Sequence, residues 1–144
     1  MKRTQIVSLV HDTIQTYSTQ NPYEIAEALD IELMITPLPD RTKGCLVLMD
    51  GVWVIMLNDK LDEYAARMTM AHEIGHYVLH RDLSTVFMDT TFVNKGKIER
   101  EANLFGIYLL YPSDTDLFDL GDTISNIHAS TGIPSHILQM RLED

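Results

Sequence analysis

The pentapeptide His72-Glu73-Ile74-Gly75-His76 constrains the fold of this chain more than any other feature. Residues four positions apart in an α-helix lie one turn above each other, so two imidazoles at this spacing can bind one metal ion. Glu73 leaves the same turn, where its carboxylate can accept a proton from a water held by that ion. Zinc hydrolases use this arrangement. The pattern therefore predicts metal ligands at His72 and His76 and a catalytic base at Glu73.

The residues around the pentapeptide predict the helix that this arrangement requires. One stripe of side chains recurs every three or four residues over about five turns. It consists of Leu61, Ala65, Met68, His72, His76 and Leu79. Asn58 or Asp59 is the expected N-cap. A single histidine on such a face usually makes ordinary hydrogen bonds, but two histidines that flank a glutamate favour a metal site.

Two helices and a small antiparallel or mixed sheet are predicted before this helix. Hydrophobic periodicity indicates a helix over residues 6–17 and, after the cap Asn21, a short helix over 22–29. The expected strands cover 31–36, 45–49 and 52–57, and the last two flank Asp50-Gly51, a pair typical of a hairpin turn. Since the hairpin leads almost directly into the histidine-bearing helix, we expect the sheet to pack beside the pentapeptide.

A second long helix is predicted over residues 97–111, where Pro112 forces its end. Residues 82–96, between the two long helices, are expected to form a loop with a short extended piece at 86–88. The pattern of elements gives an α/β (α+β) fold in which both long helices pack with the sheet.

The C-terminal tail reads as helix, turn and helix, over residues 123–130, 131–132 and 133–142. Arg141 is the only lysine or arginine after Arg100, whereas acidic residues are frequent, so the tail lacks the charge that holds phosphates. We therefore expect the tail to pack against the rest of the chain or to dock a partner.

Composition indicates a single domain over residues 1–144. Cys45 is the only cysteine, so neither an intramolecular disulfide nor a thiolate zinc cluster can form, and zinc must use histidine and carboxylate.

The formal net charge of −10, with scattered lysines and arginines, excludes direct nucleic-acid binding. Polar residues interrupt the first apolar stretch, so neither a signal peptide nor a membrane span is expected, and we predict a cytoplasmic protein.

A zinc hydrolase needs a third protein ligand and one open position. A third histidine six residues after the second is one known solution, but Asp82 occupies that position here. His80 lies four residues beyond His76, and the helix rotates about 40° and rises about 6 Å between them, which turns the third ring away from a shared ion. His80 is therefore expected near the cleft or on the surface.

A glutamate on the second long helix is the other solution, and Glu99 and Glu101 both qualify. About 200° of helix rotation separates them, so we expect only one to face the first helix. Glu99 lies on the side of Gly106, which would let another helix approach closely. We favour Glu99 as the ligand, although acids in a first turn also occur as solvated residues that the helix dipole favours.

Two motifs of the chain resemble those of the ImmA/IrrE metallopeptidases. The first is His-Glu-Ile-Gly-His-Tyr-Val-Leu-His at 72–80, and the second is Glu-Arg-Glu-Ala-Asn-Leu-Phe-Gly-Ile-Tyr-Leu-Leu-Tyr-Pro at 99–112. The resemblance covers most of the chain. Gly106 stands where alanine is usual and Tyr111 where methionine is usual, and neither is an expected ligand.

The resemblance implies a zincin-like fold in which His72, His76 and Glu99 hold zinc and Glu73 is the base. An exposed sheet edge beside the cleft is expected to hold an extended substrate by strand addition. The residue that stabilises the oxyanion stays open among five candidates, since spacing does not choose between them. The candidates are Tyr77, His80, Tyr108, Tyr111 and His128.

The resemblance also implies a substrate. Members of the family cleave or act on helix-turn-helix repressors of phages, integrative elements or radiation responses, and so relieve repression. We expect a stand-alone antirepressor endopeptidase whose repressor is a separate protein. The alternative is a zinc-binding regulator that titrates a repressor without hydrolysis. A purely structural zinc domain fits less well, because three ligands leave the fourth position open.

Overall fold

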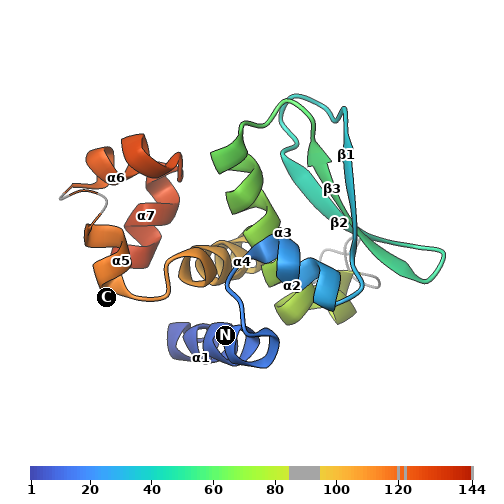
Figure 1. Ribbon diagram of the computed structural model, residues 1–144, viewed down its shortest axis with the longest axis horizontal. Coiled ribbons are helices and arrows are strands. Elements are labelled where there is room, and N and C mark those ends of the chain that lie inside the picture. Colours follow the sequence, from blue (N-terminus) through green and yellow to red (C-terminus); the bar gives the residue numbers. More distant parts are fainter. Residues whose placement is uncertain (85–94, 120, 122, 144) are drawn as a thin grey trace.

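A three-stranded sheet is the first layer of the computed structural model, which describes residues 1–84, 95–119, 121 and 123–143 (Figure 1). The strands β1 (Glu32–Thr36), β2 (Gly44–Met49) and β3 (Val52–Asn58) have the order β1-β3-β2. β1 runs parallel to β3 and β2 antiparallel to it. Asp50 and Gly51 both have positive φ, as a tight hairpin turn between β2 and β3 requires. The predicted mixed sheet and hairpin are confirmed.

The helices surround one long central helix. They are α1 (Arg3–Tyr17), α2 (Pro22–Ala28), α3 (Glu63–Ser84), α4 (Lys95–Leu110), α5 (Asp114–Phe118), α6 (Ile124–Thr131) and α7 (Ser135–Leu142). In Figure 1, α3 lies between the sheet and α4, while α5, α6 and α7 gather at the far end of α4. The predicted zincin-like α+β fold is confirmed, but the expectation that both long helices pack with the sheet is not, because α4 packs mainly on α3 and α1 while α3 covers the sheet. The short helix α5 is an element that the sequence did not predict. Among the described helices, none has the length and apolar character needed to cross a bilayer.

The start of α3 differs from the prediction. Asp62 caps this helix, since the backbone N–H of Ala65 donates to its carboxylate at 2.8 Å, and the prediction of Asn58 or Asp59 as the cap is wrong. Asn58 is instead buried, and its amide donates to the carbonyl oxygens of Leu38 and Thr42. It thereby holds the loop before β2 against the end of β3.

The end of α3 also differs from the prediction, because the helix continues to Ser84 and α4 already begins at Lys95. The expected loop over 82–96 is therefore helical at both of its ends. The extended piece expected at 86–88 lies outside the described residues.

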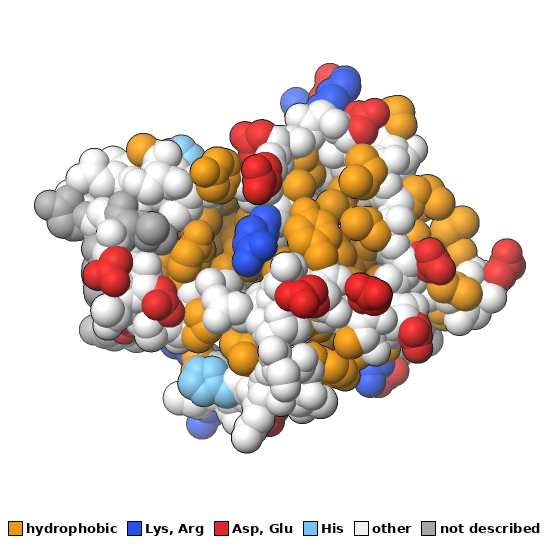
Figure 2. Space-filling view, viewed as in Figure 1, with side chains coloured by type: hydrophobic (Ala, Val, Ile, Leu, Met, Phe, Trp, Pro, Cys, Tyr) orange, Lys and Arg blue, Asp and Glu red, His pale blue; other side chains and the backbone are white. Residues whose placement is uncertain are grey.

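The sheet packs one face on α3 and leaves apolar side chains exposed at its edges. Ile55 of β3 is fully buried, and its register partners are Leu33 of β1 and Leu46 of β2. Leu33 is exposed in β1, whereas Leu46 is buried in β2. Figure 2 shows apolar side chains gathered over the region that the strands occupy in Figure 1. The exposed ones in the strands are Leu33, Met34, Ile35, Leu48, Met49 and Val52.

α3 and α4 approach each other closely at two glycines. A Cβ atom placed on Gly106 of α4 would lie 3.0 Å from the backbone nitrogen of His72, and one on Gly75 of α3 would lie 3.0 Å from the carbonyl oxygen of Ala102. The predicted close approach at Gly106 is therefore confirmed. Because His72 lies at this contact, the spacing of the two helices also positions the pentapeptide.

We expect Gly106→Leu to destabilise the protein, because its side chain would force α3 and α4 apart. Overpacking of this kind costs about 1 to 3 kcal/mol in the free energy of unfolding. Gly106→Ala is the control, because its single added methyl meets the flexible end of Met68 as well as the His72 backbone, and alanine favours the helix. Urea unfolding of the metal-free variants measures both changes, and a leucine variant as stable as the alanine variant would contradict the prediction.

Arg141 joins the C-terminal tail to α4. Its side chain is fully buried, donates to the Tyr111 carbonyl at 2.7 Å and to Asp114 at 3.1 Å, and stacks over the Tyr108 ring. The tail thus packs on the rest of the chain, as predicted. Its one cation is buried in this contact rather than presented to solvent.

Replacing Arg141 with methionine should therefore destabilise the tail. The change removes the stacking on Tyr108 and leaves the Tyr111 carbonyl without its donor, and an acceptor left unsatisfied in this way costs about 1 to 3 kcal/mol. The free energy of unfolding from urea titration measures the effect, with Lys60→Met, which removes an exposed cation that pairs with Asp40 and not with the tail, as control. Equal stability of the two variants would show that Arg141 does not hold the tail.

Candidate metal centre

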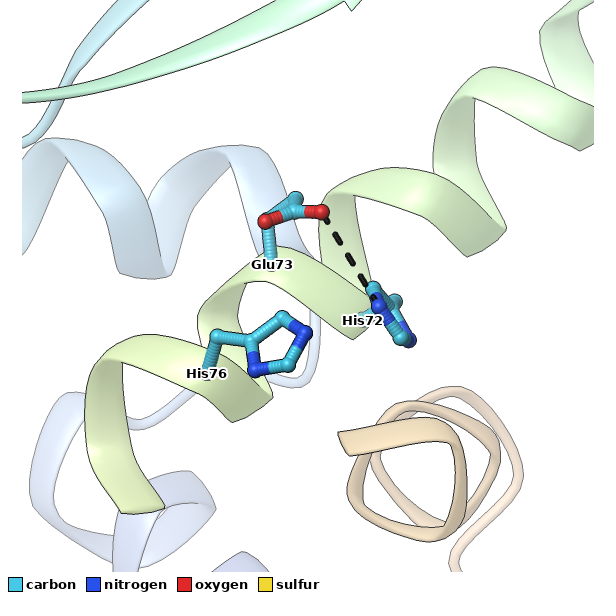
Figure 3. A group of neighbouring side chains, drawn as sticks. All are labelled: His72, Glu73 and His76. Atoms are coloured by element: carbon cyan, nitrogen blue, oxygen red, sulfur yellow. Dashed lines mark ion pairs between the residues drawn. The ribbon is translucent and has the colours of Figure 1, made fainter. Parts of the chain in front are cut away.

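His72, His76 and Glu99 meet at one point between α3 and α4. The Nε2 atom of His72 lies 3.0 Å from one carboxylate oxygen of Glu99, and the Nε2 atom of His76 lies 2.9 Å from the other. The two rings are perpendicular, with centroids 4.6 Å apart. Figure 3 shows that both rings come from adjacent turns of α3. The helical spacing of the pentapeptide therefore brings both Nε2 atoms to the carboxylate of α4.

These three side chains fit a zinc ion chemically. Zinc bound by imidazole nitrogen and carboxylate oxygen has ligand atoms about 2.1 Å away, which places tetrahedral ligands about 3.4 Å from one another. The observed separations of 3.0 and 2.9 Å are those of hydrogen bonds and lie close to this value. Two nitrogen donors and one oxygen donor also leave a fourth position for water or substrate.

Hydrogen bonds and nearby charges shift the pKa values of Glu99 and His72. Hydrogen bonds from His72 and His76 hold the pKa of the Glu99 carboxyl well below its usual range, so Glu99 is ionised. Burial lowers the pKa of His72, but the hydrogen bond to Glu99 and the charge of Glu73 outweigh burial and raise it. A negative carboxylate thus faces two imidazoles in a partly buried place, which favours a cation there.

Glu73 occupies a different position from Glu99. Its side chain is 5 % exposed, and one of its oxygens is 3.9 Å from the His72 Nε2 atom (Figure 3). Its oxygen, with the two imidazoles, could also surround an ion. However, Glu99 is closer to the imidazoles and contacts both of them. Burial raises the pKa of the Glu73 carboxyl. A carboxyl group with a raised pKa is better suited to accept and release protons near neutral pH.

His80 and Glu101 form a second contact between the same helices. His80 is 4 % exposed, and its Nε2 atom lies 3.0 Å from a carboxylate oxygen of Glu101. The expectation that only one of Glu99 and Glu101 faces α3 is therefore wrong. Both reach it, because the two glutamates meet α3 at different levels and His80 extends from the turn beyond His76. Of the two environments predicted for His80, the surface position is excluded.

A cleft of about 380 Å³ opens beside His72, Glu73 and Glu99. One wall is the loop from Arg41 to Gly44 at the start of β2, and another is the turn between α6 and α7, with His136 of α7. The tail thus contributes to the site. Sequence reasoning missed His136 and the loop cations Arg41 and Lys43, because no local pattern links these distant segments to the pentapeptide.

The candidates for oxyanion stabilisation lie elsewhere. In the described part of the chain, none of Tyr77, His80, Tyr108, Tyr111 and His128 lines the cleft. Tyr77 packs edge-on against Trp53, Tyr108 lies beneath Arg141, and the Nδ1 atom of His128 is 2.6 Å from the Ile133 carbonyl. His136 is the imidazole of the tail that does line the cleft, and it takes their place as the residue to test.

Comparison with known proteins identifies a family and two similar proteins. Residues 26–143 match the peptidase family described as the IrrE N-terminal-like domain. The chain is 28 % identical over 141 residues to "Uncharacterized immunity region protein 2" of Bacillus phage phi105, covering 96 % of this chain and 89 % of the phage protein. It is 32 % identical over 104 residues to "Metallopeptidase ImmA" of Bacillus subtilis (strain 168), covering 70 % of this chain and 60 % of that protein.

Proposed function

Because the chain belongs to the ImmA/IrrE family of metallopeptidases, we propose that it is a zinc-dependent endopeptidase that cleaves a helix-turn-helix repressor of a phage or mobile element. Glu99 carries this proposal, since its carboxylate contacts the Nε2 atoms of both His72 and His76 beside a buried glutamate and an open cleft. His72, His76 and Glu99 are the proposed zinc ligands, and Glu73 is the proposed catalytic base.

Zinc and Glu73 have different roles in the proposed hydrolysis. When bound, zinc supplies a Lewis acid that lowers the pKa of water toward neutrality and polarises a peptide carbonyl. Glu73 accepts the proton of the attacking water and passes it to the nitrogen of the leaving amine. Burial favours this exchange, because it raises the pKa of Glu73 toward the range in which a carboxyl group both takes and gives a proton.

The sheet edge beside the cleft provides a place for the substrate backbone. β2 is an edge strand in the sheet of the described residues, and Gly44 at its start lines the cleft with Lys43. An extended peptide that pairs with β2 would pass along the metal centre, with its backbone held by strand hydrogen bonds. Lys43 and Arg41 lie where they can donate to substrate carbonyl oxygens.

The phage relative supports a repressor as the substrate. A protein named for a phage immunity region is similar over nearly all of this chain, which agrees with the phage repressors that the family resemblance implies as substrates. We propose that the repressor is a separate cytoplasmic protein, and that its cleavage relieves repression. A second function, titration of the repressor without hydrolysis, needs the cleft as a binding groove but has no use for a buried carboxylate beside the metal.

A reporter assay with a candidate repressor separates these two functions. Cells carry the repressor with an epitope tag, a reporter gene under its operator, and the wild-type or Glu73→Gln protein. The proposal predicts that the wild type switches the reporter on while full-length repressor disappears from an immunoblot. Relief of repression by both proteins, with the repressor intact, would instead establish titration.

A further inference from the structure

A row of buried polar side chains extends from His76 away from the cleft. The Nδ1 atoms of His76 and His80 are 3.1 Å apart, and the Nε2 atom of His80 lies 3.0 Å from Glu101. His80 and Glu101 are 4 % and 7 % exposed. Neither residue lines the cleft. They contact the site where the Nδ1 atom of His80 meets the Nδ1 atom of His76, the ring nitrogen that does not face Glu99.

The donors and acceptors of this row can be assigned in one consistent way. The Glu101 carboxylate only accepts, so the Nε2 atom of His80 carries the hydrogen that it donates to Glu101. The Nδ1 atom of neutral His80 is then an acceptor, and the His76 Nδ1 atom must supply the hydrogen between the two rings. His76 thus has its hydrogen on Nδ1, which is the tautomer whose Nε2 lone pair can bind a metal ion.

Metal binding leaves this assignment unchanged. The Nε2 atom of His76 lies 2.9 Å from a carboxylate oxygen of Glu99, and its Nδ1 atom lies 3.1 Å from the Nδ1 atom of His80. A metal ion held by the Nε2 atom would leave the Nδ1 atom of His76 free to keep its contact with His80. A histidine ligand whose second nitrogen donates to a neighbouring group keeps its ring orientation and becomes a stronger ligand.

We propose that His80 and Glu101 are positioning residues for the metal centre, which hold His76 in its Nδ1-protonated form with the Nε2 atom directed at the ion. This inference rests on the proposed function only in taking His76 as a metal ligand. It assigns a use to the third histidine of the 72–80 motif, which is not one of the proposed ligands.

Zinc affinity of two His80 variants tests the positioning role. In His80→Asn, the amide oxygen lies near the position of Nδ1 and can accept from His76, whereas His80→Leu fills a similar volume without an acceptor. We expect His80→Leu to bind zinc about 10 to 100 times more weakly than the wild type, as loss of a partner behind a metal ligand does. His80→Asn should recover much of this loss. Competition with a chromophoric zinc chelator measures the affinities without any substrate.

Two further measurements distinguish positioning from packing. Unfolding of the metal-free proteins reports packing, and there the leucine variant should be at least as stable as the asparagine variant, the reverse of their order in zinc affinity. Nitrogen-15 NMR of the zinc-loaded protein should show His76 with a hydrogen on Nδ1 that exchanges slowly in the wild type and faster in His80→Leu. Glu101→Gln, which keeps the shape, should weaken zinc binding less.

Two results would overturn the inference. One is zinc affinity in His80→Leu equal to that of the wild type, and the other is equal loss in the leucine and asparagine variants. Failure of the protein to cleave any repressor would contradict the proposed function but not the positioning role, because zinc affinity is measured independently of hydrolysis.

Discussion

Replacement of Glu73 by glutamine should lower kcat for repressor cleavage by about a thousandfold, the range attributed to a positioned general base. Glutamine has nearly the same shape as glutamate but cannot accept the proton of water or return it to the leaving amine. Glu73 is not a proposed ligand, so zinc affinity should stay at the wild-type value. Cleavage rates at saturating repressor, measured with zinc content matched between the proteins, give the comparison.

His11→Gln, on the exposed face of α1, is the control for the procedure and should cleave at the wild-type rate. A Glu73→Gln protein that still cleaves at a rate close to the wild type would remove Glu73 from the reaction. A variant that loses zinc as well as activity would place Glu73 among the ligands, where its distance of 3.9 Å from His72 does not favour it.

The second large effect is expected for Glu99→Gln, which should weaken zinc binding by more than about a hundredfold. This loss exceeds the effect of removing a residue that only hydrogen-bonds to a metal ligand. The change replaces a charged oxygen ligand by a neutral amide and leaves His72 and His76 as the only strong donors. Chelator competition measures the affinity, and activity at limiting zinc should fall with it.

Glu101→Gln is the matched control, because it makes the same chemical change on the same helix. Its effect on zinc affinity should be at most about tenfold, since Glu101 acts through His80 and His76 and its amide replacement can still accept a hydrogen bond. If Glu101→Gln weakened zinc binding more than Glu99→Gln did, the ligand assignment would be wrong.

The parts of the site that local geometry determines could be predicted from sequence. The i, i+4 spacing of His72 and His76 places them together on any helix, and the glycine at 106 correctly indicated where a second helix comes close. Glu99 was chosen because a third ligand is needed and because of its side of the helix, and the structure brings its carboxylate into contact with both imidazoles. The hairpin followed in the same way from Asp50-Gly51 and the apolar runs beside it.

The parts that depend on tertiary packing could not be predicted. Asp62 rather than Asn58 caps α3, because Asn58 is used to hold the neighbouring loop. Rotation along one helix indicated that Glu99 and Glu101 face opposite ways, yet both contact α3. Glu101 does so because α3 extends past His76 and presents His80 one turn further on. His136 reaches the cleft only because Arg141 and its neighbours fold the tail back on α4.

The most direct test of the proposed peptidase activity is the intact mass of a purified repressor after incubation with the zinc-loaded protein. The account predicts two fragments from the wild type whose masses sum to that of the repressor plus one water, their loss on chelation and return with added zinc, and none with Glu73→Gln. Intact repressor in a stable complex with both proteins, released from its operator, would contradict hydrolysis and establish binding alone.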